Sequence, residues 1–347
     1  MVQVSTSPAD PEPQPAVSSL PTGPCDNESG RLVALINPLS FRMSLRDRAE
    51  RSIKRVEAHG GTAFEASQLD DIEQALGTAY SSTGPISRLV IAGGDGTLQA
   101  VASWLARTLD PQQFPDLIVL SAGRTNYVAA DVGTRKHFLD TLEQILNQPL
   151  EALHPELRQT LRLQHPDFGQ QIGFFAAAGL VDYAIRDIHQ WRAMRSSWWR
   201  NHHGATAAGL IRLGFRSLVG RSKYQAEKLL IDAGELGRLD GPNKLLLMTT
   251  LKLSGSAAQP YAQRGRGVLR MTAIRDDAVA FKRNLPNILR GRFKPDMDIK
   301  NGYLSGYCNS ILIENINQIT LYGQEFDLDP ERPLQVEAGP AFRFLRP

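Results

Sequence analysis

From residue 31 onward, short apolar runs alternate with segments that repeat apolar side chains every three or four positions. The apolar runs cover residues 31–37, 62–67, 87–92 and 116–122. The helical repeats cover residues 45–61, 69–80, 97–108 and 138–148. Strands that alternate with amphipathic helices are typical of a parallel sheet with helices on its faces. The pattern therefore predicts an α/β domain, Rossmann-like in its parallel sheet, over residues 30–153.

Beyond residue 154 the pattern changes to strand-like runs separated by Gly, Pro, Asn and Asp. These runs cover residues 160–165, 171–179, 228–233, 244–253, 267–275, 301–314, 318–328 and 334–345. Short strands at this spacing are typical of an antiparallel sandwich. One interruption, at about residues 183–221, has helical character. We therefore expect a β-sandwich domain over residues 154–347 with a helical insertion, and its last strand could return to the first domain.

Composition narrows the classes of protein that the chain can represent. Residues 1–29 are rich in Pro and Ser with few apolar side chains, which predicts a disordered tail. The net charge of +3 is too small for nucleic-acid binding through bulk charge. Two distant cysteines exclude a disulfide framework and fit a reducing compartment. No apolar run approaches the roughly 18–20 residues that cross a bilayer. We expect a cytoplasmic protein, soluble or peripherally attached to a membrane.

The segment "GGDGT", residues 93–97, joins an apolar run to a helical one. Backbone N–H groups at such a junction bind phosphate, and glycines let the phosphate come close. Thr97 is expected to cap the helix. A carboxylate beside phosphate is repulsive unless a cation lies between them or the carboxylate accepts a proton. Asp95 therefore indicates phosphoryl transfer, a reaction that uses Mg²⁺.

"GGDGTL" after an apolar strand resembles the nucleotide-binding loop of the diacylglycerol kinase catalytic domain family, which includes sphingosine kinases and bacterial lipid kinases. Other segments resemble further parts of this family in the same order. They are "LINPLS" with Asn37, "SAGRTNYVAADVG" at residues 121–133, "GFFAAAGLVDYAI", "ITLYGQEF" and the closing strand "LQVEAGPAFRFLRP". The resemblance covers residues 31–347. It implies an α/β nucleotide domain and a β-sandwich with the active site between them.

The resemblance also implies ATP and Mg²⁺ as cofactors and a set of nucleotide-binding residues. These are Asn37, Gly93, Gly94, Asp95, Gly96, Thr97, Gly123, Arg124, Thr125 and Asn126. The chain departs from the family at Arg124, which replaces a Thr, and at Tyr127, which replaces an Asp. The C-terminal Asp-Gly-Glu of the family reads Tyr322, Gly323, Gln324, Glu325, so an expected carboxylate is missing or displaced.

The implied function is an ATP-dependent kinase that acts on the hydroxyl of a membrane lipid, with a diacylglycerol, a sphingoid base or a ceramide-like lipid all open. Asp95, helped by Glu325, would orient or deprotonate that hydroxyl. Alternatively, Glu325, Asp327 or Asp329 substitutes for the missing carboxylate as the base. Alternatively, the protein binds nucleotide and lipid but transfers phosphate slowly or not at all. A less favoured alternative is NAD kinase, which shares a GGDGT loop but whose other motifs we do not find.

A basic and aromatic stretch over residues 185–223 holds eight Lys or Arg residues, one Asp and three tryptophans. Trp rings prefer the headgroup region, and basic side chains are attracted to anionic lipids. The hypothesis is transient docking on an anionic membrane surface through Trp191, Arg192, Arg195, Trp198, Trp199 and Arg200. A solvated helix face with tryptophans in the core is the alternative. Nucleic acid is not expected as a partner, because no nucleic-acid motif accompanies the stretch. Metal ligands and oligomeric state stay unassigned.

Overall fold

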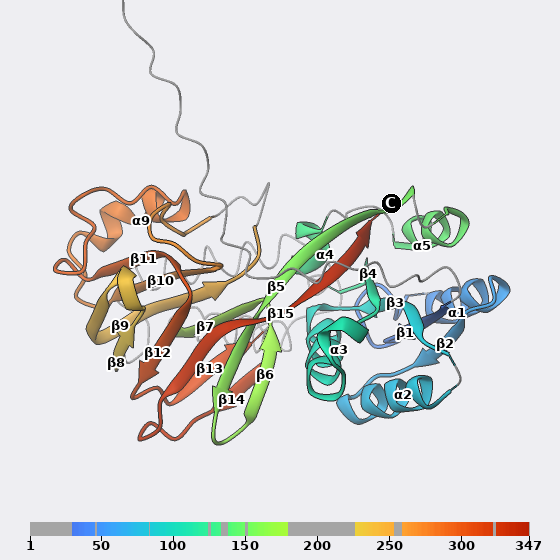
Figure 1. The fold of residues 1–347 in the computed structure, drawn as a ribbon. Helices are drawn as coiled ribbons and strands as arrows, with labels where there is room; N and C mark the ends of the chain where they lie inside the picture. The colour runs from blue at the N-terminus through green and yellow to red at the C-terminus, as the bar shows by residue number, and fades with distance from the viewer. Residues whose placement is uncertain are drawn as a thin grey trace, which may run out of the picture.

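The computed structural model describes residues 30–45, 47–82, 84–123, 126–132, 138–149, 152–179, 226–252, 259–321 and 324–346. A mostly parallel N-terminal portion of the sheet continues into antiparallel strands toward the C-terminus (Figure 1). The described strands belong to one hydrogen-bonded network of 15 strands. This arrangement confirms the predicted α/β class with an antiparallel second half. None of the described helices is long and apolar enough to cross a membrane.

The parallel portion runs in the order β4-β3-β1-β2. Its strands are β1 (Arg31–Ile36), β2 (Thr62–Glu65), β3 (Ile86–Gly93) and β4 (Asp116–Ser121). Its helices are α1 (Arg48–Ala58), α2 (Leu69–Ser81), α3 (Asp95–Thr108), α4 (Tyr127–Asp131) and α5 (Phe138–Asn147). Side chains alternate along each strand, so α2 and α3 cover one face and α1 and α5 the other. The predicted strand–helix alternation produces this two-sided burial.

The antiparallel portion curls around a second apolar core. Its strands are β5 (His154–His165), β6 (Gly169–Gly173), β7 (Phe175–Gly179), β8 (Glu227–Asp232), β9 (Arg238–Thr249), β10 (Leu269–Arg275), β11 (Tyr303–Cys308), β12 (Ser310–Glu314), β13 (Gln318–Leu321), β14 (Gln324–Asp327) and β15 (Leu334–Arg346). The first half of β9 pairs with β8, and its second half pairs with β7 and β10. This change of partners turns the sheet back over its own core.

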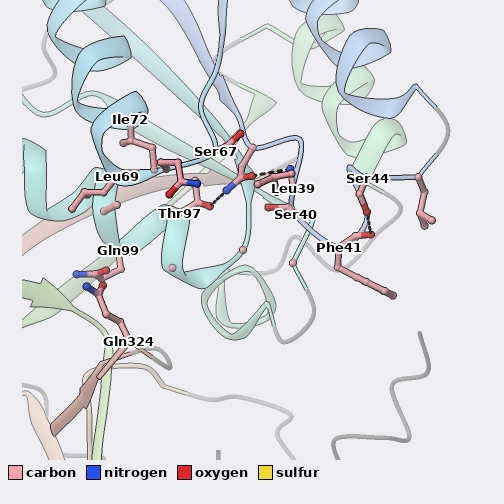
Figure 2. A pocket seen from close by; sticks show the side chains of 17 residues that line it. Leu39, Ser40, Phe41, Ser44, Ser67, Leu69, Ile72, Thr97, Gln99 and Gln324 are labelled. Atoms are coloured by element: carbon pink, nitrogen blue, oxygen red, sulfur yellow. Dashed lines mark hydrogen bonds between the residues drawn. The ribbon is translucent and has the colours of Figure 1, made fainter. Parts of the chain in front are cut away.

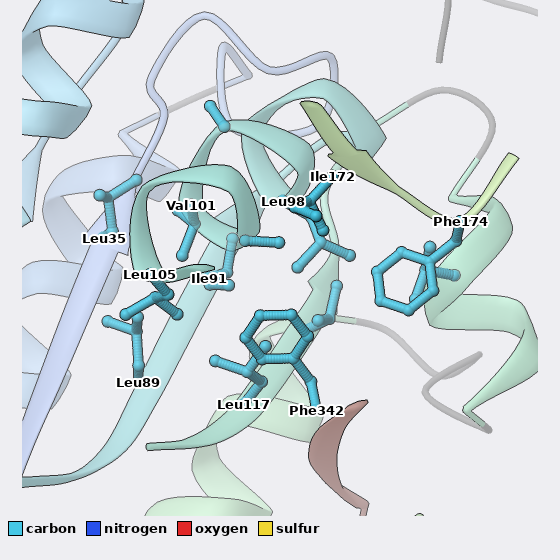
Figure 3. Packing of buried hydrophobic residues seen from close by; sticks show 14 of the residues in the cluster. Leu35, Leu89, Ile91, Leu98, Val101, Leu105, Leu117, Ile172, Phe174 and Phe342 are labelled. Atoms are coloured by element: carbon cyan, nitrogen blue, oxygen red, sulfur yellow. The ribbon is translucent and has the colours of Figure 1, made fainter. Parts of the chain in front are cut away.

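The last strand, β15, joins the two halves of the molecule. Its first part pairs with β12, and its end reaches β4 in parallel at Phe344 and Leu117, while β5 follows it along most of its length. Phe342 and Phe344 are fully buried beneath α3. The Phe342 ring stacks on Phe114 with centroids 4.6 Å apart. Figure 3 shows Phe342 beside Leu117 in the core that α3 covers. One apolar core therefore contains residues from both ends of the chain.

Two helices were not predicted from the sequence. Helix α9 (Phe281–Leu289) is nine residues long and contains Pro286, and α4 has only five residues. Both are too short for a clear helical repeat. Two single 3₁₀ turns, Pro111–Gln113 and Gly234–Leu236, complete the described helical segments. The helix expected at about residues 183–221 lies outside the described residues.

The buried ring of Phe342 predicts a large loss of stability on truncation. We expect Phe342→Ala to lower the free energy of unfolding by about 3–5 kcal/mol, because it leaves a cavity in the shared core. Urea denaturation followed by circular dichroism measures this loss. Leu157→Ala, at a side chain that is 42% exposed on β5, is the control and should cost less than about 1 kcal/mol. Equal losses in the two variants would contradict the shared core.

Candidate active site

Two glycine loops meet at one edge of the parallel sheet. The first loop links β3 to α3, and the second links β4 to α4. Strands β3 and β4 are parallel neighbours with Gly93 opposite Ser121, so both loops leave from the same edge. A Cβ atom on Gly123 would lie 2.5 Å from the Cα atom of Gly94. The glycines therefore allow the two backbones to touch, in addition to leaving room for a ligand.

Asn126 closes the second loop from within. Its backbone has a left-handed φ of 52°, which asparagine adopts more readily than most residues. The backbone N–H of Gly123 donates to Oδ1 of Asn126, and Nδ2 of Asn126 donates back to the Gly123 carbonyl. Each donor–acceptor distance is 2.8 Å. These bonds are buried. They join Gly123 directly to Asn126 at the start of α4.

Asp95 connects the first loop to the second. Its Oδ2 accepts a hydrogen bond from the Tyr127 amide at 3.0 Å, and its Oδ1 accepts one from the Val128 amide at 3.3 Å. These amides belong to the first turn of α4, where negative charge is favourable. Burial raises the pKa of Asp95, while hydrogen bonds from the amides of Tyr127, Val128 and Asn126 act to lower it. The carboxyl group is thus both a structural link and a titratable group of altered acidity.

The structure corrects one prediction, that Thr97 caps α3. The helix begins at Asp95 with Gly94 in the capping position, and no side chain caps it. Thr97 lies in the first turn, where its hydroxyl accepts a hydrogen bond from Nδ2 of Asn37 at 3.0 Å. Asn37 in turn accepts from the Leu39 amide through Oδ1. The N–H groups of the first turn of α3 are therefore left without a side-chain cap, as phosphate binding requires.

A cavity of about 680 Å³ opens beside these loops (Figure 2). Its described lining residues are all uncharged. They are Asn37, Leu39, Ser40, Phe41, Ser44, Leu45, Ser67, Gln68, Leu69, Ile72, Gly94, Gly96, Thr97, Gln99, Ala100, Gly123 and Gln324. Its wall contains apolar side chains of α2 and also hydroxyl and amide groups. Such a mixture suits a ligand with both a flat apolar part and polar groups.

Two glutamines of this wall were missed by the sequence analysis. Gln99 is 4% exposed, and its Nε2 donates to Oγ of Ser103 and Oε1 of Gln171, each at 3.3 Å. Among the described residues nothing donates to Oε1 of Gln99. Gln324, on β14, lines the same cavity. Figure 2 shows its side chain extending toward that of Gln99. Helical spacing could have pointed to Gln99. Residues three and four positions after Gly96 lie on the same face of α3, and these residues are Gln99 and Ala100.

Other predicted site residues lie apart from the cavity or outside the described residues. Nε2 of Gln318 donates to Glu325 at 3.4 Å and to Asp327 at 2.9 Å, so these carboxylates share the exposed face of β14. Side chains alternate along a strand, and Gln324 takes the face toward the cavity. Asp329 shapes a turn by accepting from the Glu331 amide. Arg124, Thr125, Tyr322 and the six predicted membrane-docking residues lie outside the described residues.

The described residues offer no ready-made metal site. No group of three or more His, Cys, Asp or Glu side chains among them is arranged to hold a metal ion. The described cavity lining also has no carboxylate. Asp95, which stands between the lining residues Gly94 and Gly96, is already bonded to backbone amides. The described residues therefore do not fit a magnesium ion held by the protein alone.

The second loop is anchored to the antiparallel half by a buried ion pair. Nε of Arg158, on β5, lies 2.6 Å from Oδ2 of Asp131 at the end of α4. The two side chains are 7% and 1% exposed. Glu156 binds the same guanidinium at 2.9 Å and helps to satisfy its charge. The position of α4, and with it the Asp95 contact, therefore depends on both halves of the molecule.

Glycine loops that lead into an uncapped helix start are typical of phosphate-binding sites. Residues 31–154 match the family model described as the diacylglycerol kinase catalytic domain. The match covers about a third of the chain. A comparison with curated proteins finds no match.

Solved structures extend the likeness to the whole described fold. The crystal structure of a diacylglycerol kinase from Bacillus anthracis str. Sterne matches with a TM-score of 0.58 at 12% identity, covering 91% of this chain and 97% of that one. Two further structures from the same organism match with TM-scores of 0.60 and 0.57, at 12% and 11% identity and with the same coverage. At these identities the likeness concerns the fold, which confirms the predicted pairing of an α/β domain with antiparallel strands.

The contact between the loops predicts opposite effects of two Gly→Ala changes. Gly123→Ala should lower the free energy of unfolding by about 1–3 kcal/mol, because the backbone of Gly94 cannot move aside. Gly96→Ala should leave it unchanged or raise it by up to about 1 kcal/mol, because its Cβ meets open space and alanine favours a helix. Chemical denaturation compares the two proteins. Similar stabilities would show that the loops do not touch as described.

Proposed function

We propose that the protein is an ATP-dependent lipid kinase that phosphorylates a hydroxyl group of a membrane lipid. The observation that carries this proposal is the pair of joined glycine loops, with Asp95 between them, beside an uncharged cavity. The match of residues 31–154 to the model of the diacylglycerol kinase catalytic domain supports it. A diacylglycerol, a sphingoid base and a ceramide-like lipid are all acceptors of the right chemistry.

The triphosphate of ATP would lie against the start of α3 and the glycine loops. Gly94, Gly96 and Gly123 expose backbone there, and the helix N-terminus favours negative charge. Gly93, Arg124 and Thr125 complete the proposed phosphate site on the strength of the family resemblance. Thr97 and Asn37, already bonded to each other, line the same wall.

The nucleoside part would lie toward the two glutamines. Oε1 of Gln99 is fixed in orientation, because the amide nitrogen of the same side chain is held by Ser103 and Gln171. It can accept a hydrogen bond from a ribose hydroxyl or an amino group of a base. Leu69 and Ile72 offer an apolar wall of the same cavity for a flat ring. Gln324 supplies a second amide that can donate or accept.

In the proposed reaction the oxygen of the lipid hydroxyl attacks the γ-phosphorus of ATP. A new P–O bond forms, the bond from the γ-phosphorus to the β–γ bridging oxygen breaks, and ADP leaves. The hydroxyl proton passes to the carboxylate of Asp95, whose pKa is raised by burial. Glu325 stays a predicted helper that faces away from the cavity. Mg²⁺ is expected as the counter-ion of the nucleotide, and no step is assigned to it.

A catalytically silent nucleotide- and lipid-binding protein is the second candidate. Both carboxylate oxygens of Asp95 already accept amide hydrogen bonds, which is the geometry of a structural link. The exposed placement of Glu325 and Asp327 removes two alternative bases from the cavity wall. These observations favour this alternative specifically, and it predicts nucleotide binding without turnover.

Incubation with labelled ATP, Mg²⁺ and a total lipid extract tests the kinase proposal. We expect a labelled lipid from the wild-type protein, and a rate lowered about 10²- to 10⁴-fold in Asp95→Ala, because the proton acceptor is lost. Asp140→Ala, at an exposed carboxylate of α5, is the matched control and should keep the wild-type rate.

Thermal stability with and without ATP separates the remaining outcomes of this experiment. No labelled lipid from the wild-type protein, together with stabilisation by ATP, would overturn the kinase proposal in favour of the silent protein. Neither labelling nor stabilisation would overturn both. The melting temperature of Asp95→Ala without ligand reports how far the loss of the loop contact contributes to its lower rate.

If Gln324 contacts the nucleoside part of ATP, Gln324→Ala should lower the affinity for ATP but not for a ligand without a nucleoside. Loss of one hydrogen bond should weaken ATP binding about 3- to 10-fold, by roughly 0.5–1.5 kcal/mol, and leave binding of inorganic tripolyphosphate unchanged. Isothermal titration calorimetry measures both affinities. Gln318→Ala, on the neighbouring strand β13, should change neither. Equal weakening for ATP and tripolyphosphate would place Gln324 at the phosphates and contradict the assignment.

A further inference from the structure

A strongly basic surface lies on and around α9, far along the chain from the glycine loops. We call it the α9 surface and define it by its exposed residues, which are Val279, Lys282, Arg283, Pro286, Leu289, Arg290, Arg292 and Lys294. From Val279 to Lys294 the chain has five Lys or Arg residues and no Asp or Glu. The net charge of the whole chain is only +3. This surface is therefore a local concentration of positive charge.

The inner face of α9 fixes which side chains point outward. Asn284 and Ile288 are buried, and Ile288 packs in a small core with Met297 and Tyr303. Nδ2 of Asn284 donates to the Tyr303 hydroxyl at 3.4 Å, and that hydroxyl donates to the Val279 carbonyl at 2.6 Å. The helix cannot rotate without breaking these contacts. Its basic side is therefore held toward solvent.

Apolar side chains are exposed in the same surface. Val279 is 57% exposed and Leu289 is 44% exposed, at the two ends of α9. Nearby acidic side chains before the helix are already engaged, since Asp276 pairs with Lys244 and Asp277 with Arg275. Exposed apolar groups among cations are typical of a helix that lies on an anionic membrane, where the apolar groups enter the headgroup region. The phosphate backbone of a nucleic acid would bind the cations but would offer Val279 and Leu289 no apolar contact.

The α9 surface is tied to the core beneath the candidate active site. The Gln259 amide donates to the Leu289 carbonyl at 2.9 Å. Gly291 has a φ of +67°, and a Cβ atom there would lie 2.7 Å from the carbonyl oxygen of Tyr261. The Tyr261 side chain is buried in the core against which Tyr127 packs, and the Tyr127 amide holds Asp95. Figure 1 shows α9 at the end of the antiparallel half that lies away from α1 and α2.

We propose that the α9 surface docks the protein on an anionic lipid membrane. The cations contact lipid phosphates, and Val279 and Leu289 enter the headgroup region. Docking of this kind goes beyond the proposed kinase activity and does not require it, because binding needs neither ATP nor turnover. The surface also differs from the basic stretch at residues 185–223, which lies outside the described residues.

Co-sedimentation of the full chain with vesicles tests the proposal without nucleotide. We expect binding to vesicles of phosphatidylcholine mixed with phosphatidylglycerol, and little binding to pure phosphatidylcholine. The double variant Arg290→Glu with Arg292→Glu should weaken binding at least about tenfold, because two attractive charges become repulsive. Leu289→Gln should weaken it less, and this loss should persist at high salt, where charge is screened.

A control variant with the same change in charge tests whether vesicle binding depends on the α9 surface or on the net charge of the protein. Arg51→Glu with Lys228→Glu changes two exposed cations on α1 and β8 and should bind vesicles like the wild-type protein. Thermal unfolding verifies that each variant is folded. Wild-type binding by the α9 double variant would overturn the proposal, as would an equal loss in the control. Tighter binding to duplex DNA than to the mixed vesicles would assign the surface to nucleic acid instead. A protein that binds vesicles without kinase activity leaves the proposal intact.

Discussion

The carboxylate of Asp95, bonded to the amides of Tyr127 and Val128, holds the two glycine loops in one arrangement. Both loops rise from neighbouring parallel strands, so the sheet brings them near each other but does not fix their contact. Gly94 and Gly123 allow the approach, and Asn126 bonds to Gly123. Gly94 and Gly123 also line the cavity. Its form therefore follows from one charged group paired with the start of a short helix.

That helix is held in turn by the antiparallel half. Arg158 of β5 binds Asp131 at the end of α4, and β5 follows β15 into the core beneath α3. Phe342 and Phe344 belong to that core although they lie near the C-terminus of the chain. The two halves therefore do not act as independent bodies joined by a linker. A change in the antiparallel strands can reach the glycine loops through Arg158 without touching the cavity.

Local patterns predicted most of the secondary structure, and they predicted less of the site. Strand and helix repeats along residues 31–153 are local, so the parallel sheet and its helices were within reach of the sequence. The capping of α3 by Thr97 was wrong, because the bond to Asn37 joins residues 60 positions apart. Gln324 was missed as a wall residue, since only the paired strands β13 and β14 decide which of Gln324 and Glu325 faces the cavity. Short elements such as α9 depend on packing with Tyr303, which no local repeat reveals.

The contact from Asp95 to backbone amides also bears on which substitutions this site tolerates in evolution. An amide N–H is present whatever side chain its residue carries, so the link to Asp95 does not depend on a tyrosine at position 127. The two glycines that touch have no such freedom, because any side chain at Gly123 meets the backbone of Gly94. Substitutions that leave the backbone in place can therefore change the side chains near Asp95 while its link to α4 is kept.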